Sequence, residues 1–527
     1  MYHVTVGISE KEYDAFAIAS SQTNLLHSSK WAQVKSNWQN ERLGFYKDDQ
    51  LVAVASILIK SLPLGFTMLY IPRGPIMDYS NKELVNFVLK TLKNFGRKKR
   101  AVFAKFDPAL LLRQYHLKEE NVAEEIDESR QAIDNLKSAG AQWIGPTKAI
   151  SETIQPRFQA NIYTKANIEE NFPKHTKRLI KDAKHRGVQI YRANIDDLPK
   201  FATVVALTEN RKGVALRNEN YFHQLMTIYG EDAYLYLAKV NLPKRLAQFK
   251  EQLLQIQKDL SETPSHQKSR LTRLNQQEAS VKQYILEFQE FSKKYPDEPV
   301  IAGILSIRFG NVLEMLYAGM DDSFRKFYPQ YLLNARVFED AFKNDIVSAN
   351  LGGVEGSLND GLTKFKSNFN PMFEEYIGEF NLAINPLLDF LRNKIWYNSS
   401  MNYEASKQLT DVRFKRLVGV QRTTFEEMLA VLKTAYQRKH AKGGRTPKLS
   451  LEDLLMATLQ YMREYRTYEQ IAADFGIHES NLIRRSQWVE STLIQSGFTI
   501  SKTHLSAEDT VIVDATEVKI NRPKKIN

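Results

Sequence analysis

The 527-residue sequence contains no cysteine and no long uninterrupted apolar run. The absence of cysteine excludes disulfides, thiol nucleophiles and thiolate metal sites. No segment approaches the ~18–20 consecutive apolar residues that a membrane-spanning helix needs. The first ten residues also lack the charged-then-apolar pattern of a secretory signal. Together these absences predict a cytoplasmic protein.

Apolar residues are nevertheless plentiful, at 43% of the chain, and the formal net charge is +12. This apolar fraction is sufficient for packed cores, and the length suggests about three or four domains. A basic excess favours anionic partners such as nucleic acid, phosphorylated substrates or an anionic membrane surface.

Residues 242–294 form a charge-rich segment with a heptad-like apolar stripe. The stripe of its first half is Leu246, Phe249, Leu253, Ile256 and Leu260. Pro264 and its small polar neighbours interrupt the pattern, which then resumes through residue 288. The spacing predicts an antiparallel coiled-coil hairpin. Such a hairpin could be a dimerisation or spacer coil, or a basic arm that binds a polyanion.

Short apolar runs alternate with amphipathic helices on both sides of this hairpin, which indicates an α/β fold. Asp107 follows a predicted strand over residues 101–106, a position typical of α/β active sites and equally typical of a helix cap. Arg73 lies in a proline-bounded loop that would present its guanidinium. Lys35 follows Trp31 on a predicted helix and would be either a phosphate or substrate contact or a surface lysine.

A run of like charge marks another predicted helix. Its basic residues are Lys174, Lys177, Arg178, Lys181 and Lys184. A solvated helix face is the usual explanation of a charge run, but the single sign here favours an anion site. The glycine-dense residues 350–356 are typical of backbone that approaches a ligand.

Motifs in a consistent order give residues 1 to about 386 a family resemblance. These motifs are WAQVKSNW, YIPRGPIMDY, FDP, QPRFQANIY, NFPKHTKRLIKDAKHRG, ENRKGVALR, YAGM, NLGGVEGSL and LTKFKSNFNP. They resemble the FemABX aminoacyltransferases, most closely the MurM/MurN branch and within it the MurN side. The resemblance implies an α/β (α+β) fold with twin GNAT-like subdomains, at residues 1–150 and at 151–241 with 295–395. The hairpin at 242–294 would be inserted into the second subdomain.

The same resemblance implies an activity without any cofactor. The expected donor is aminoacyl-tRNA, with alanine as the amino acid. The expected acceptor is the stem-peptide branch of lipid II, which places the enzyme peripherally at the inner face of the plasma membrane. Family positions for the precursor fall on Lys35 and Arg211, the acidic strand-end position on Asp107, and the aminoacyl-tRNA positions on Phe365 and Lys366.

Aminoacyl transfer from tRNA to an amine makes few chemical demands on the protein. Aminolysis of an ester needs a neutral amine, stabilisation of an oxyanion and alignment of two substrates, and it needs no metal or covalent enzyme intermediate. Lys366 could stabilise the oxyanion or the terminal ribose-phosphate. Asp107 could accept a proton or orient the ammonium, and an ordinary aspartate pKa of ~3.9 favours orientation. Arg73 could contact the precursor pyrophosphate, and the basic run at 174–184 and the hairpin could contact tRNA.

Residues 401–500 follow a different pattern, which predicts an all-α helix-turn-helix tail. Ala472, Gly476 and Leu482 have the spacing of that motif, although any two packed helices can imitate it. The residues that would then face the major groove of DNA are Ser480, Asn481, Arg484 and Arg485.

The tail resembles the N-terminal half of an IS5-type insertion-sequence transposase. In this resemblance residues 505–527 begin a DDE catalytic core, and Asp514 is its first carboxylate. A single carboxylate cannot hold the two metal ions that strand transfer requires, so this part would be catalytically inactive and would hold no metal. We interpret the chain as a readthrough fusion at an inserted element.

Three hypotheses follow for the whole chain. It is an aminoacyltransferase that acts on lipid II, a DNA-binding transposase fragment that carries a passenger domain, or an inactive fusion whose transferase fold is disrupted near residue 386.

Overall fold

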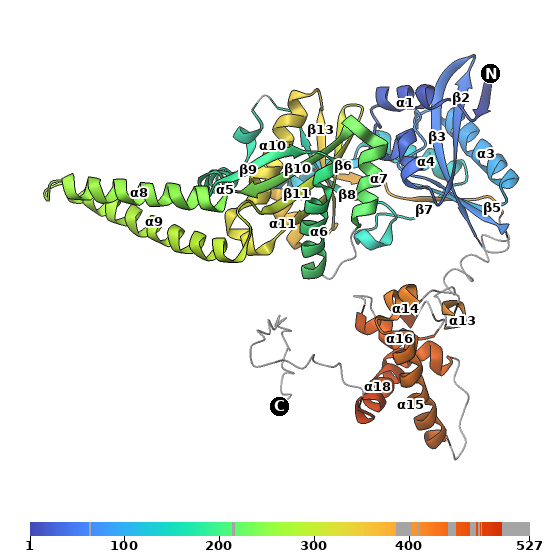
Figure 1. Cartoon of the computed structure of the whole chain (residues 1–527). Coiled ribbons are helices and arrows are strands. Elements are labelled where there is room, and N and C mark those ends of the chain that lie inside the picture. The colour runs from blue at the N-terminus through green and yellow to red at the C-terminus, as the bar shows by residue number, and fades with distance from the viewer. Residues whose placement is uncertain are drawn as a thin grey trace, which may run out of the picture. The chain divides into compact units, whose positions relative to one another are not determined.

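The computed structural model describes residues 1–62, 65–165, 167–212, 217–385, 403–407, 411–440, 449–463, 471–472, 475 and 477–497. The chain divides into two compact units, Met1–Pro386 and Leu387–Asn527 (Figure 1). Among the described residues, no helix combines the length and apolarity needed to cross a bilayer.

Unit 1 is built on two mixed sheets. In spatial order the first sheet contains β1 (Tyr2–Val6), β2 (Gln39–Lys47), β3 (Gln50–Ser61), β4 (Thr67–Ile71), β5 (Ala101–Phe106), β15 (Phe380–Ala383) and β7 (Gln142–Trp143). The second contains β6 (Leu111–Tyr115), β14 (Met372–Tyr376), β8 (Phe158–Tyr163), β13 (Ser348–Val354), β12 (Val312–Met320), β11 (Val300–Phe309), β10 (Ala233–Val240) and β9 (Val188–Ala193).

The two sheets exchange strands. β6, from the N-terminal part of the chain, pairs with β14 of the second sheet, whereas β15, from the C-terminal part, pairs with β5 of the first. A hydrogen bond from Ile377 N to Leu110 O, 2.9 Å long, lies where both chain segments pass between the sheets. The exchange ties the two halves into one body.

Helices cover the sheets in layers. On the first sheet lie α3 (Lys82–Lys98) and α4 (Asp127–Ser138). One face of the second sheet carries α5 (Lys174–His185) and α10 (Pro329–Lys343), and the other carries α6 (Leu198–Lys212) and α7 (Glu219–Tyr229). The remaining helices of these layers are α1 (Glu10–Ala19), α2 (Ser29–Val34) and α11 (Gly361–Ser367).

The predicted hairpin is confirmed. Helices α8 (Leu242–Glu262) and α9 (Lys268–Lys294) project from the second sheet as a long arm (Figure 1). Phe249 is fully buried at its base, with its ring centroid 5.1 Å from that of Tyr284 and 5.2 Å from that of Phe288. The same base contacts the end of α5, because Arg186 Nη1 pairs with Glu287 Oε2 at 2.9 Å. The arm therefore braces α5.

Two local expectations differ from the structure. The helix predicted around Trp31 and Lys35 ends at Val34, so Lys35 caps it instead of continuing its face. The glycine-dense segment was expected to approach a ligand. At Gly353 it approaches protein instead, because a Cβ there would lie 2.3 Å from Pro156 Cβ.

Unit 2 is helical in its described part. Its helices are α13 (Tyr403–Ser406), α14 (Asp411–Val418), α15 (Arg422–His440), α16 (Leu451–Arg463) and α18 (Glu479–Gln495). Ala472 and Leu482, two positions of the expected motif, are buried in its core. The third, Gly476, lies outside the described residues.

The hairpin base predicts a local stability effect. Phe249→Ala should lower the free energy of opening of α8 and α9 by roughly 3–5 kcal/mol, since a buried ring is replaced by a cavity. Leu254→Ala is the control, because Leu254 is 67% exposed and its loss should cost less than about 0.5 kcal/mol. Hydrogen exchange of hairpin peptides measures both, and equal exchange in the two variants would contradict the packing described.

Candidate functional site

A buried ion pair lies where the two sheets meet. Asp107 follows β5, and its Oδ2 lies 3.5 Å from Arg73 Nη1. Its Oδ1 accepts hydrogen bonds from Tyr70 Oη at 3.1 Å and from the Arg73 backbone N–H at 3.2 Å. Arg73 also donates to Pro156 O at 2.8 Å and stacks over the Tyr376 ring at 4.3 Å. These contacts hold Arg73 in the left-handed backbone region, at φ 55°.

The burial of this pair changes two expectations, that Arg73 contacts the precursor pyrophosphate and that Asp107 has an ordinary pKa. Arg73 is 1% exposed and Asp107 is 2% exposed, so neither guanidinium nor carboxylate lies on the surface. Burial raises the pKa of Asp107 to about 7, assisted by Glu379 and opposed by Arg73. An ordinary aspartate pKa therefore no longer favours orientation of the ammonium over proton transfer, and the carboxyl is held by Arg73 and Tyr70. Arg73 lies in the interior and not in the exposed position expected of a pyrophosphate ligand.

A second group of carboxylates lies on the neighbouring strands. Glu374 on β14 is buried and accepts hydrogen bonds from Tyr163, Asn161, Tyr376 and Gln114. Glu314 on β12 is half-buried, and its Oε1 accepts a hydrogen bond from Asn24 Nδ2 at 3.1 Å. Burial raises the pKa of Glu314 to about 7; the Asn350 hydrogen bond and the Arg73 charge oppose this shift, and Glu374 adds to it.

Lys366 lies close to this group because it contacts β13, the strand that carries Asn350. Its ammonium donates to Gly353 O at 2.8 Å, and its side chain is 6% exposed. Asn350 donates to Gln159 Oε1 at 2.7 Å and accepts from Gly352 N at 2.7 Å. Hydrogen bonds thus link Glu314 to Asn350 and Asn350 to Gly352, and Lys366 bonds to Gly353, the next residue in the chain.

Phe365 packs in an aromatic cluster beside Lys366. Its ring centroid lies 5.7 Å from that of Tyr331 and 5.6 Å from that of Phe369. The half-buried ring therefore has a packing role whatever else it contacts.

Lys35 lies in a separate polar and aromatic group. Its ammonium is 5.1 Å from the Trp31 ring centre, and burial, with the charge of Arg217, lowers its pKa. Arg217 lies over the Tyr221 ring at 4.9 Å, and Tyr221 and Tyr317 have ring centroids 5.9 Å apart. Arg211 belongs to the last turn of α6, and its side chain lies outside the described residues.

The basic run forms one exposed stripe along α5. All five predicted residues are exposed, whereas Leu179, Ile180 and Ala183 on the opposite side are buried. The stripe runs from Lys174 to Lys184, about 15 Å at the rise of an α-helix. The sequence thus located a solvent-facing cationic surface.

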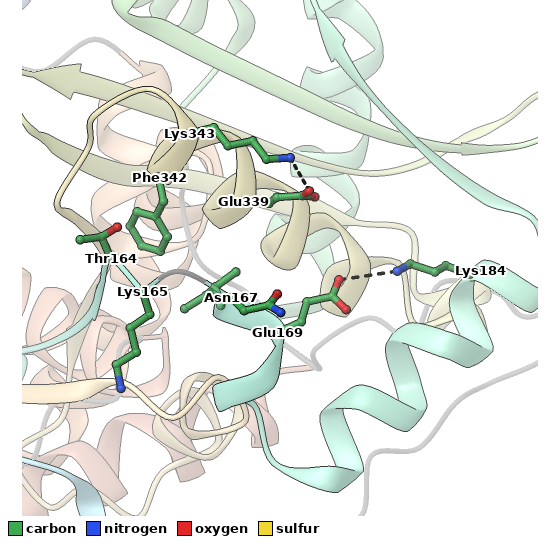
Figure 2. Close-up of a pocket in the computed structure, with 9 residues that line it drawn as sticks. Thr164, Lys165, Asn167, Glu169, Lys184, Glu339, Phe342 and Lys343 are labelled. Carbon is green, nitrogen blue, oxygen red and sulfur yellow. Dashed lines mark hydrogen bonds and ion pairs between the residues drawn. The ribbon is translucent and has the colours of Figure 1, made fainter.

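Lys184 also lines a cavity of about 650 Å³ between η5 (Ile168–Asn171), α5 and α10. Figure 2 shows Phe342 on one side of this cavity and Asn167 and Glu169 on another. Two other cavities, of about 520 and 400 Å³, lie beside α4 and beside the end of α3. Lys35, Asp107 and Lys366 line none of these three.

In unit 2 the predicted DNA-facing residues lie on the first turns of α18. Ser480, Asn481 and Arg484 are exposed, and Arg484 donates to Asn481 Oδ1 at 3.1 Å. Arg485 is half-buried, and burial lowers its pKa. Asp514 lies outside the described residues.

Sequence reasoning did not identify Glu314, Tyr221 or Tyr317. A signal was present for Glu314, because a lone carboxylate in the apolar strand sequence VLEMLY indicates a buried acid. Tyr317 opens the YAGM motif, but nothing in the sequence placed it beside Tyr221, because their proximity depends on α7 packing near β12.

Comparisons with known proteins distinguish the two units. The model of the FemAB family matches residues 8–393, and a model described as the helix-turn-helix of DDE superfamily endonuclease matches residues 447–499. The lipid II:glycine glycyltransferase of Staphylococcus aureus (strain MRSA252) is 26% identical over 402 residues, which cover 72% of this chain and 92% of the relative. The enzyme of the same name from Staphylococcus saprophyticus is 26% identical over 74% of this chain and 95% of its own length.

A crystal structure of FemX superposes with a TM-score of 0.63 at 25% identity, over 74% of this chain and 99% of FemX. The twin GNAT-like fold expected from the sequence is confirmed, as is the similarity of the tail to a transposase helix-turn-helix.

The raised pKa of Glu314 predicts a pH-dependent stability. Between about pH 4.5 and pH 7 the unfolded carboxyl is ionised while the folded one stays protonated, so stability falls as pH rises through this window and is constant above it. Glu314→Gln should remove up to about 3 kcal/mol of this fall. Urea unfolding at pH 5 and pH 7.5 measures the difference, and an identical pH dependence in both proteins would refute it.

Proposed function

The chain belongs to the FemAB family, and on this premise we propose that unit 1 transfers an amino acid from aminoacyl-tRNA to the stem peptide of lipid II, in the synthesis of peptidoglycan cross-bridges. The observation that carries the proposal is the match to lipid II:glycine glycyltransferases over more than nine tenths of their length. Since lipid II is membrane-bound, the protein would act peripherally at the inner face of the plasma membrane.

The amino acid and the branch of the family form the finer part of the proposal. The resemblance to the MurM/MurN branch favours alanine, whereas the relatives named above are glycyltransferases. Alanyl-tRNA and glycyl-tRNA offered in competition would separate the two, with alanine expected in the product.

The reaction forms a C–N bond, breaks a C–O bond and moves one proton from nitrogen to oxygen. The amine nitrogen of the stem-peptide branch attacks the ester carbonyl carbon, the C–O bond to the tRNA ribose breaks, and the amine proton ends on the departing ribose oxygen. Lys366 would stabilise the oxyanion or the adjacent ribose-phosphate through the positive charge of its ammonium, which Gly353 O holds in place. Phe365 would contact the terminal nucleotide of the donor.

A carboxylate with a raised pKa would accept the proton from the amine and pass it to the departing ribose oxygen. Glu314 suits this role better than Asp107, because Glu314 is only half-buried while Asp107 is enclosed by Arg73 and Tyr70. Asp107 and Arg73 would then be positioning residues. Lys35 and Arg211 would hold the precursor, and the α5 stripe would bind tRNA phosphates.

A second function is proposed for unit 2. The match to a transposase helix-turn-helix and the exposed Asn481 and Arg484 favour DNA binding by α18. We interpret this unit as part of an insertion-sequence transposase fused to the transferase.

Lys366→Met tests the transferase role. The variant should lose about 10²–10³-fold in kcat, because a cation positioned for the developing oxyanion is removed. Lys364→Met is the matched control, since Lys364 is exposed on the same helix and should leave the rate unchanged.

The assay measures transfer of a labelled amino acid from charged tRNA to lipid II, with circular dichroism as the check on folding. A wild-type rate in folded Lys366→Met protein would refute the assigned role. No product from the wild-type chain would favour the inactive fusion.

Arg484→Ala tests the tail. The variant should bind a duplex carrying the terminal repeats of the inserted element about tenfold more weakly, since one base or phosphate contact is lost. Thr434→Ala, an exposed change on α15, should bind normally. A gel shift measures both, and unchanged DNA mobility with the wild-type chain at low salt would contradict DNA binding.

A further inference from the structure

Helices α5 and α10 run side by side from the Phe365–Lys366 segment to the cavity shown in Figure 2. At one end, Thr176 of α5 donates to Asn368 O at 2.5 Å, and Asn368 donates to Tyr331 Oη of α10 at 3.3 Å. At the other end, Lys184 of α5 and Phe342 of α10 both line the cavity. The exposed cationic stripe runs along the same helix, on the side of α5 away from the buried Thr176, and ends at Lys184 beside the cavity.

The cavity itself suits a nucleobase better than a phosphate. Lys184 Nζ lies 3.6 Å from Glu169 Oε1, and Lys343 Nζ lies 2.6 Å from Glu339 Oε1, so two of its cations are already paired (Figure 2). Phe342 provides an aromatic ring on which a base can stack. The oxygens of Asn167 and Glu169 are acceptors of the kind that recognise an exocyclic amino group such as cytosine N4.

We propose that this cavity binds a cytidine from the single-stranded 3′ end of the donor tRNA, a few nucleotides before the aminoacylated adenosine. The proposal rests on the proposed function, since it takes the adenosine to lie at Lys366. The stripe of α5 would hold the intervening phosphates, and Phe342, Asn167 and Glu169 would fix the register of the strand. The volume of about 650 Å³ leaves room for a pyrimidine and its ribose.

Binding of an uncharged acceptor minihelix tests the subsite without any need for transfer. A fluorescent minihelix ending in single-stranded ACCA is titrated with the full chain by anisotropy. Phe342→Ala should weaken binding about tenfold, the effect expected from the loss of one base–aromatic stack, and Phe342→Tyr should restore it. Lys184→Glu, at an exposed position, is a second variant that tests the subsite if Phe342→Ala does not fold. Lys137→Glu on α4 is its charge-matched control.

A minihelix with uridines in place of its cytidines tests the base preference. It should bind the wild type about tenfold more weakly, and the difference should disappear in Phe342→Ala and in Asn167→Ala. Equal affinity of the wild type for both RNAs, unchanged binding by both Phe342→Ala and Lys184→Glu, or no binding of either RNA to the wild type would overturn the subsite.

Failure of the subsite and failure of the proposed function give different results. Transfer to lipid II with minihelix binding unaffected by the cavity variants overturns the subsite alone. Cavity-dependent RNA binding without transfer by the wild type overturns the enzyme alone. A rise in the KM for lipid II, with RNA binding unchanged, would assign the cavity to the precursor and also overturn the subsite.

Discussion

The buried ion pair of Arg73 and Asp107 is the constraint on which unit 1 depends. It lies where the chain passes between the sheets, with β14 on one side and β15 on the other. A buried charge that loses its partner costs about 3–5 kcal/mol, so the loop at Arg73 and the end of β5 must stay together. Tyr376 of β14 completes the contact by covering the guanidinium. The pair therefore fixes the relative positions of two half-domains that contribute different residues to the candidate site.

One face of the second sheet carries α5 with its exposed cationic stripe. The stripe on α5 ends beside the base of the hairpin, where Arg186 pairs with Glu287 and Phe249 is packed between aromatic rings. The hairpin therefore has a structural role beside α5, whether or not it also binds a polyanion. Its base supports α5 directly, so the hairpin contributes to the cationic surface through the helix that it braces.

Periodicity and turn chemistry were sufficient to predict much of the fold. The heptad stripe located α8 and α9, and the strand over residues 101–106 was predicted with Asp107 at its end. The burial of Arg73 could not be predicted, because an arginine between prolines looks exposed until the partner strand is placed. The group formed by Glu314, Asn350 and Lys366 was also missed, since its members meet only when β12 and β13 pair in parallel. Local sequence thus predicted elements, and long-range pairing determined the site.

The central claim is that this chain uses charged RNA to lengthen the peptide of lipid II. The most direct measurement is mass spectrometry of lipid II after incubation with the purified chain and aminoacyl-tRNA, with and without prior ribonuclease treatment. The account predicts one added amino acid on the stem-peptide branch, and none after ribonuclease. Unmodified lipid II in both samples, or the same addition after ribonuclease treatment, would contradict it.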